Sequence, residues 1–79
     1  MHFYRNPATH LYVVESQGSW FCFERVVNDG DYFYDESYDL QPARDVSRSS
    51  VEPVHPLTAM TETGWDSRRI RRAIRQQAS

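Results

Sequence analysis

Two runs of β-branched and aromatic residues, separated by a short polar stretch, constrain the fold of this chain more than any other feature of its sequence. Residues 11–15 (LYVVE) and residues 20–27 (WFCFERVV) each have the composition of a β-strand. Residues 16–19 (SQGS) separate them and contain Gly18, which can adopt the positive φ that a tight hairpin turn needs. The sequence therefore predicts an antiparallel hairpin.

Further strands are predicted on both sides of this hairpin. Residues 28–31 (NDGD) are predicted to form a second turn, with Gly30 at its left-handed position, and residues 32–34 (YFY) are predicted to form the strand that follows. Residues 2–5 (HFYR) form a short additional strand. The prediction is a small antiparallel β-meander of three to four strands within residues 1–40.

The longer strand of the hairpin is apolar on both faces. Side chains alternate between the faces of a strand, so Trp20 and Cys22 lie on one face while Phe21 and Phe23 lie on the other. One face is expected to bury itself against the rest of the chain. The other face is covered either by loops and termini or by a second subunit.

The second half of the chain has a different pattern. Residues 41–56 are polar, lack periodicity and are interrupted by prolines, which is typical of a linker or a long surface loop. Residues 57–78 are predicted to be helical, because Pro56 suits the first position of a helix and Gly64 can end a first short one. We expect one domain of the α+β class over residues 1–79.

The last helix has the clearest sequence signals. Asp66 or Ser67 can cap its N-terminus, and Trp65 precedes it. One stripe of this helix consists of Ile70, Ala73, Ile74 and Gln77. The prediction is a C-terminal amphipathic helix that packs on one face of the meander through Trp65 and this stripe.

Charge is distributed unevenly in a chain whose net charge is −2. Residues 65–79 contain five arginines and one acid, whereas residues 28–45 contain six acids and one arginine. Five arginine pairs in the helix are three or four residues apart, and their repulsion costs an isolated helix about 1–2.5 kcal/mol. The helix therefore needs an anionic counter-surface. The arginines concerned are Arg68, Arg69, Arg71, Arg72 and Arg75.

Three kinds of counter-surface are compatible with this helix: the acidic segment of the same chain, either within the fold or across a homodimer; the acidic surface of another protein; and nucleic acid. The sequence pI of about 5.8 weighs against nucleic acid, because the acidic segment repels phosphates. A membrane partner is not expected, since two isoleucines and an alanine make too narrow an apolar face. The acidic segment meant here is residues 29–39, whose acids are Asp29, Asp31, Asp35, Glu36 and Asp39.

The acidic segment is itself a candidate partner-binding surface. Tyr32 and Tyr34 alternate there with carboxylates that include Asp35 and Glu36. Tyrosine offers a wide, rigid contact area at low entropic cost, which is why interfaces favour it. The alternative is an edge strand whose acids protect it from aggregation.

No pattern in the sequence points to catalysis, a metal or a cofactor. Asp35 and Glu36 are adjacent, so in a strand they point to opposite faces and cannot act as a catalytic pair. The three histidines have no metal-ligand spacing with Cys22, and no glycine-rich phosphate loop is present. With a single cysteine and no signal-peptide pattern at residues 1–7, we expect a cytoplasmic, non-enzymatic protein.

These observations favour a non-catalytic protein-binding module. In general style, a small chain without lysine and with two opposite charge patches resembles the accessory proteins of phages and mobile elements, such as anti-CRISPR proteins and host-polymerase inhibitors. That resemblance implies inhibition of a host protein or complex by occlusion of a surface. The alternative hypothesis is a small nucleic-acid-binding regulator that uses the arginine-rich helix.

Overall fold

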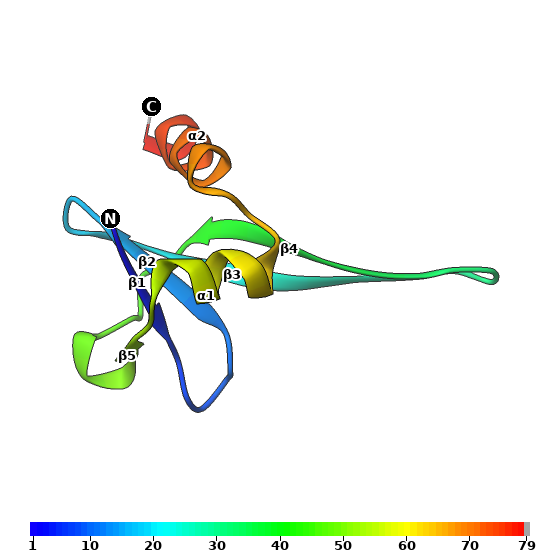
Figure 1. Ribbon diagram of the computed structural model, residues 1–79, viewed down its shortest axis with the longest axis horizontal. Coiled ribbons are helices and arrows are strands. Elements are labelled where there is room, and N and C mark those ends of the chain that lie inside the picture. Colours follow the sequence, from blue (N-terminus) through cyan, green and yellow to red (C-terminus); the bar gives the residue numbers. More distant parts are fainter. Residues whose placement is uncertain (79) are drawn as a thin grey trace.

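The computed structural model describes residues 1–78, which form one antiparallel sheet with two α-helices on one of its faces (Figure 1). In space the strands lie in the order β4-β3-β2-β1-β5. The predicted α+β class is confirmed, including a C-terminal helix packed on the sheet. The elements are β1 (His2–Arg5), β2 (Tyr12–Ser16), β3 (Ser19–Asp29), β4 (Tyr34–Pro42), the 3-10 helix η1 (Arg48–Ser50), β5 (Glu52–Pro53), α1 (Pro56–Thr63) and α2 (Ser67–Ala78).

The sheet has five strands rather than the three to four predicted. The additional strand, β5, lies within residues 41–56, the segment predicted to be a linker or loop. It pairs with β1 through Tyr4↔Pro53 and Arg5↔Glu52. A strand of two residues shows no alternation of side chains, so only the tertiary structure reveals it.

The second turn also differs from its prediction. β3 continues to Asp29 and β4 begins at Tyr34, so the turn is residues 30–33 rather than 28–31. Gly30 does not have the expected positive φ, whereas Gly18 does, at 81°. At residue 30 the absence of a side chain matters for a different reason, because a Cβ there would lie 2.6 Å from Cε1 of Phe33.

The main core lies between the sheet and the two helices. Phe23, Val14 and Ile70 are completely buried in it. Trp65 lies edge-on to Phe23, with ring centroids 5.7 Å apart. The other buried members are Phe3, Phe21, Leu40 and Ala59.

The opposite face of the sheet carries a second, smaller cluster of buried residues. Tyr4 and Val13 lie on the sheet, and Val51, from the segment before β5, packs against them. Trp20 and Val46 are partly buried around this cluster, and Arg48 stacks over the Tyr4 ring at 5.3 Å. The segment that follows β4 therefore covers part of this face, as expected from the alternative in which loops and termini, rather than a second subunit, cover it.

Local signals fix the two helices. His55 caps α1, Pro56 is its first residue, and Gly64 ends it with φ of 73°. In α2 the Asp66 carboxylate accepts a hydrogen bond from the Arg69 backbone N–H at 2.7 Å, as a capping residue does. Within residues 1–78 no helix is long and apolar enough to span a membrane.

Two side-chain hydrogen bonds tie α2 and the segment before it to the outer part of the sheet. The Trp65 indole N–H donates to the Tyr38 carbonyl at 2.8 Å, and the Gln77 amide donates to the Leu40 carbonyl at 2.7 Å. Ile70 lies between them in sequence and is fully buried. The orientation of α2 about its own axis is therefore fixed at both ends.

Candidate interaction surfaces

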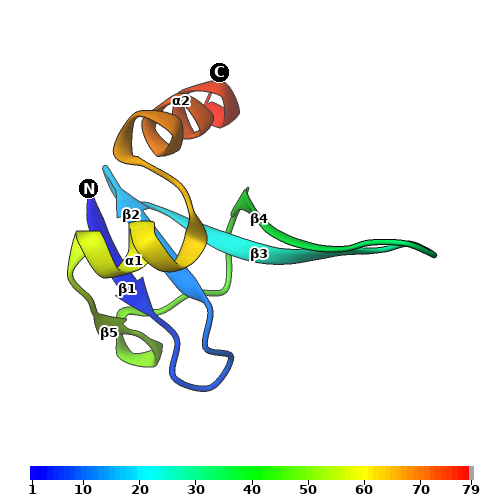
Figure 2. The ribbon, with the colours of Figure 1, turned by 45° about the vertical axis from the view of Figure 1, so that its right-hand side comes forward.

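A two-stranded arm projects from the folded body and forms the longest dimension of the molecule, which measures 42 × 30 × 24 Å (Figures 1 and 2). β2 pairs with β3 only as far as Cys22, whereas β4 pairs with β3 as far as Asp29. Beyond Phe23 and Leu40, the last buried pair, β3 and β4 have only each other as neighbours in the sheet. We define residues 24–39 as the arm and residues 30–34, which are the turn and the first residue of β4, as its tip.

Large aromatic side chains are exposed at the tip. Tyr32 is 99% exposed, and Phe33 and Tyr34 are 63% and 62% exposed. Val27, on β3, is also an exposed apolar residue. Isolated exposed apolar residues are ordinary, but four of them lie within eight residues of one short hairpin, and exposed apolar side chains that are grouped in this way are typical of binding sites.

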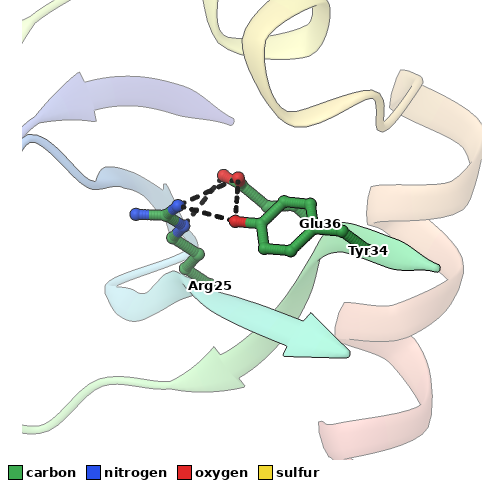
Figure 3. Close-up of polar contacts among 3 residues, drawn as sticks. All are labelled: Arg25, Tyr34 and Glu36. Carbon is green, nitrogen blue, oxygen red and sulfur yellow. Dashed lines mark hydrogen bonds and ion pairs between the residues drawn. The ribbon is translucent and has the colours of Figure 1, made fainter. Parts of the chain in front are cut away.

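One face of the arm, on the same side of the sheet as the helices, contains an ion pair (Figure 3). Arg25 Nε lies 2.8 Å from Glu36 Oε1, and a terminal guanidinium nitrogen of Arg25 donates to Glu36 Oε2 at 2.9 Å. The Tyr34 hydroxyl donates to the same carboxylate at 3.4 Å. The hydrogen bond to Glu36, reinforced by that to Tyr34, raises the pKa of Arg25 above its usual value.

The other face of the arm is acidic and has no cation. Glu24 lies directly opposite Asp39 in the ladder, and Asp35 lies opposite Asn28 on the same face. Like charges at directly opposite positions destabilise a strand pair. Among residues 1–78 the ion pair of Arg25 with Glu36 is the only salt bridge, so these three carboxylates are not neutralised. We call Glu24, Asp35 and Asp39 the acidic face.

The arginines of α2 form a second charged surface. At about 100° per residue, Arg68, Arg71, Arg72 and Arg75 fall within an arc of about 100° on the side of the helix away from the buried Ile70. All four are exposed, and none of them forms an ion pair within the described residues 1–78. We call this set the arginine stripe. Arg69 is separate, because its guanidinium stacks over the Trp65 ring at 3.8 Å.

The structure brings the predicted site residues together only in part. Four of the five helix arginines share one surface, whereas Arg69 contacts Trp65 instead. Tyr34 and Glu36 share one face of the arm, Asp35 lies on the other, and Tyr32 lies at the tip. Pairing of the helix arginines with the acidic segment within one chain, one of the alternatives left open by the sequence, is not formed among the described residues.

Several residues of the arm were not predicted to be functional from the sequence. Glu24 and Arg25 were treated as part of an ordinary strand, and Phe33 and Val27 were not recognised as exposed apolar groups. A signal is nevertheless present in residues 24–29 (ERVVND), where apolar and polar side chains do not alternate and no face is consistently apolar, as expected of a strand pair that projects into solvent.

Metal-ligating and nucleophilic side chains are a separate class of candidate. Within residues 1–78 no three histidine, cysteine or acidic side chains are grouped so that they could hold a metal. Burial raises the pKa of the Cys22 thiol, and the nearby charge of Glu24 raises it further, so Cys22 is a poor nucleophile at neutral pH. No family model, curated protein or solved structure matches this chain.

Proposed function

We propose that the chain is a non-catalytic protein-binding module and that the arm is the part that binds. The observation that carries this proposal is the exposure of Tyr32, Phe33 and Tyr34 together at the end of a projecting hairpin. These rings contribute little to the stability of their own fold. Tyr32 is almost fully exposed, so burial of its ring in a complex would add about 1.5–3 kcal/mol, and the partly covered rings of Phe33 and Tyr34 would add less.

The partner that fits the arm best is a protein with a cationic surface. The arm contains six acids and one arginine, and that arginine is already paired with Glu36. Aromatic anchors would provide most of the affinity, and the carboxylates would provide orientation and a fast approach to a basic site. A basic site on a host protein that normally binds nucleic acid is a target of this kind, and its occlusion would inhibit the host.

This proposal includes the origin and setting inferred from sequence. An accessory protein of a phage or mobile element that blocks host machinery, in the manner of an anti-CRISPR protein or a polymerase inhibitor, would act through such an arm. We further propose a cytoplasmic location, because Cys22 has no second cysteine with which to form an internal disulfide.

The test is quantitative affinity capture from an extract of the native host. The tip variant replaces Tyr32, Phe33 and Tyr34 with alanine. The control is Leu57→Ala, which removes a side chain that is as exposed as Phe33 and Tyr34, at 64%, but lies on α1. We expect a host protein that the wild type and the control retain and the tip variant loses. Equal capture by all three proteins would refute the role of the arm.

A second candidate function is nucleic-acid binding through the arginine stripe. The observation that favours it is four exposed arginines on one side of α2 with no ion pair among residues 1–78. A groove of about 440 Å³ beside Arg71 and Arg75 offers room for a phosphate and its sugar. Binding to mixed-sequence DNA or RNA that weakens steeply with salt, and less steeply after Arg71→Ala and Arg75→Ala, would support this function. The absence of binding at low salt would exclude it.

A further inference from the structure

The arginine stripe and the acidic face are two unneutralised surfaces of opposite sign on one chain. The stripe combines four like charges on a helix that has no acidic residue of its own. The acidic face places Glu24 and Asp39 opposite each other. Both arrangements oppose folding, so each surface gains stability from a partner of opposite charge.

The two surfaces cannot meet within one chain. α2 covers the sheet face that contains Phe23 and Leu40, and its arginine stripe points away from that face. Glu24 alternates with Phe23 along β3 and therefore points to the other side of the sheet, the side of Trp20. Figure 2 shows α2 above the sheet, whereas the arm extends to the right, beyond the rest of the sheet. A macromolecule that neutralises either surface is therefore a second molecule.

The dimensions of the two surfaces agree. From Arg68 to Arg75 the stripe rises about 10 Å along the helix axis, at 1.5 Å per residue. From Asp35 to Asp39 the acidic face extends about 13 Å along β4, at 3.3 Å per residue. Glu24 lies beside Asp39, about 5 Å away across the ladder. Three carboxylates thus occupy a length that four guanidinium groups can span, and guanidinium groups bind carboxylates in a bidentate geometry.

We propose that the acidic face of one copy docks on the arginine stripe of a second copy. The occupant is a second copy because the chain itself contains both surfaces, which are opposite in charge and similar in length. The two surfaces are different, so the contact is heterologous, and each docked pair keeps one free stripe and one free acidic face. Self-association therefore continues head to tail as the concentration rises, instead of stopping at a closed dimer.

The first test is sedimentation velocity of the full chain at low and high salt. We expect association at low salt that grows with concentration beyond the dimer and weakens about tenfold or more at high salt, because the paired charges are exposed. Arg75→Gln should weaken association, whereas Arg44→Gln, which removes an exposed arginine outside α2, should leave it unchanged. A wild type that is monomeric at low salt, or that stops at a dimer, would overturn the proposal.

The second test uses two complementary variants. The stripe variant replaces Arg68, Arg71, Arg72 and Arg75 with glutamine, and the face variant carries Glu24→Gln, Asp35→Asn and Asp39→Asn. Each should be monomeric, because it lacks one half of the contact. Their mixture should form a one-to-one heterodimer and nothing larger, because the stripe of the face variant can still bind the acidic face of the stripe variant.

Other outcomes of the mixing experiment contradict the proposal. Continued self-association of either variant, or a mixture that stays monomeric, would show that these surfaces do not pair. Low-salt binding of mixed-sequence single-stranded DNA by a wild type that does not self-associate would assign the stripe to nucleic acid instead. Both variants remove charges that repel each other, and neither removes the ion pair between Arg25 and Glu36. Circular dichroism should therefore show wild-type secondary structure for both.

Discussion

Replacing Arg72 with glutamine should stabilise the monomer, although the substitution removes a charged side chain from a helix surface. Arg72 is exposed and forms no ion pair among residues 1–78. It lies three or four residues from three other arginines, which are Arg68, Arg69 and Arg75. Because glutamine and arginine have similar helix propensities, the main effect of the change is the loss of three repulsive pairs.

The magnitude follows from these pairs. Each like-charge pair costs a few tenths of a kcal/mol, so the substitution should raise the free energy of unfolding by about 0.6–1.5 kcal/mol at low ionic strength. For a domain of this size, a change of 1 kcal/mol shifts Tm by about 4–8 °C. The gain should largely disappear at 1 M salt, where the Debye length is about 3 Å.

The assay is thermal and urea unfolding followed by circular dichroism, at protein concentrations low enough that the chain is monomeric. Arg69→Gln is the informative control, because it removes one repulsive pair but also the stacking of the guanidinium over Trp65 at 3.8 Å. That stacking is worth about 0.5–2 kcal/mol, so this variant should be no more stable than the wild type. A less stable Arg72→Gln variant at low salt would refute the reasoning, since it would show that Arg72 has an anionic partner within the chain.

Three further predictions concern the arm, the core and Cys22. Gly30→Ala should displace the Phe33 ring, because the new Cβ would lie 2.6 Å from Cε1 of that ring. The double variant with Phe33→Ala should restore the turn, and amide hydrogen exchange in the arm measures both effects. If the effects of the two substitutions were independent, the contact would be contradicted. Ile70→Ala should cost about 2–5 kcal/mol in urea unfolding, because Ile70 is completely buried, and a cost below 1 kcal/mol would show that α2 is not anchored there. The pKa of the Cys22 thiol is raised in the folded chain from its ordinary value of 9.0, so the unfolded chain loses this proton first and stability should decline as pH rises through 9.0. Cys22→Ala should lack this part of the decline in urea unfolding at several pH values, and an identical pH dependence in both proteins would contradict the raised pKa.

Sequence patterns predicted those parts of the fold in which one face of an element is buried. The hairpin around Gly18 and the helix around Ile70 have apolar side chains at the spacing that burial requires, and both are present. The arm was mostly missed because it has no buried face. Along Tyr34–Pro42 only Leu40 is buried and Tyr38 partly so, and the predicted strand was therefore limited to residues 32–34.

The candidate surfaces show the same limit. The sequence identified the arginines of α2 and the acids of the segment as opposite charges, because composition is sufficient for that. It could not show that Arg25 neutralises Glu36, since they are eleven residues apart in sequence and are brought together only by the register of β3 and β4. The same register separates Asp35 from Glu36 and groups Asp35 with Glu24 and Asp39.

The pairing of β3 with β4 also determines how the arm could change in length. Beyond Arg25 and Tyr38 the strand residues pair only with each other, and none of them holds the Trp65 hydrogen bond that the Tyr38 carbonyl accepts. Cross-strand pairs can therefore be added or removed there without disturbing the core. Removal of one pair would turn every more distant side chain to the opposite face and invert the tip, whereas removal of two pairs would restore its orientation. Related chains that present the same tip to the same partner should therefore differ in arm length by an even number of pairs.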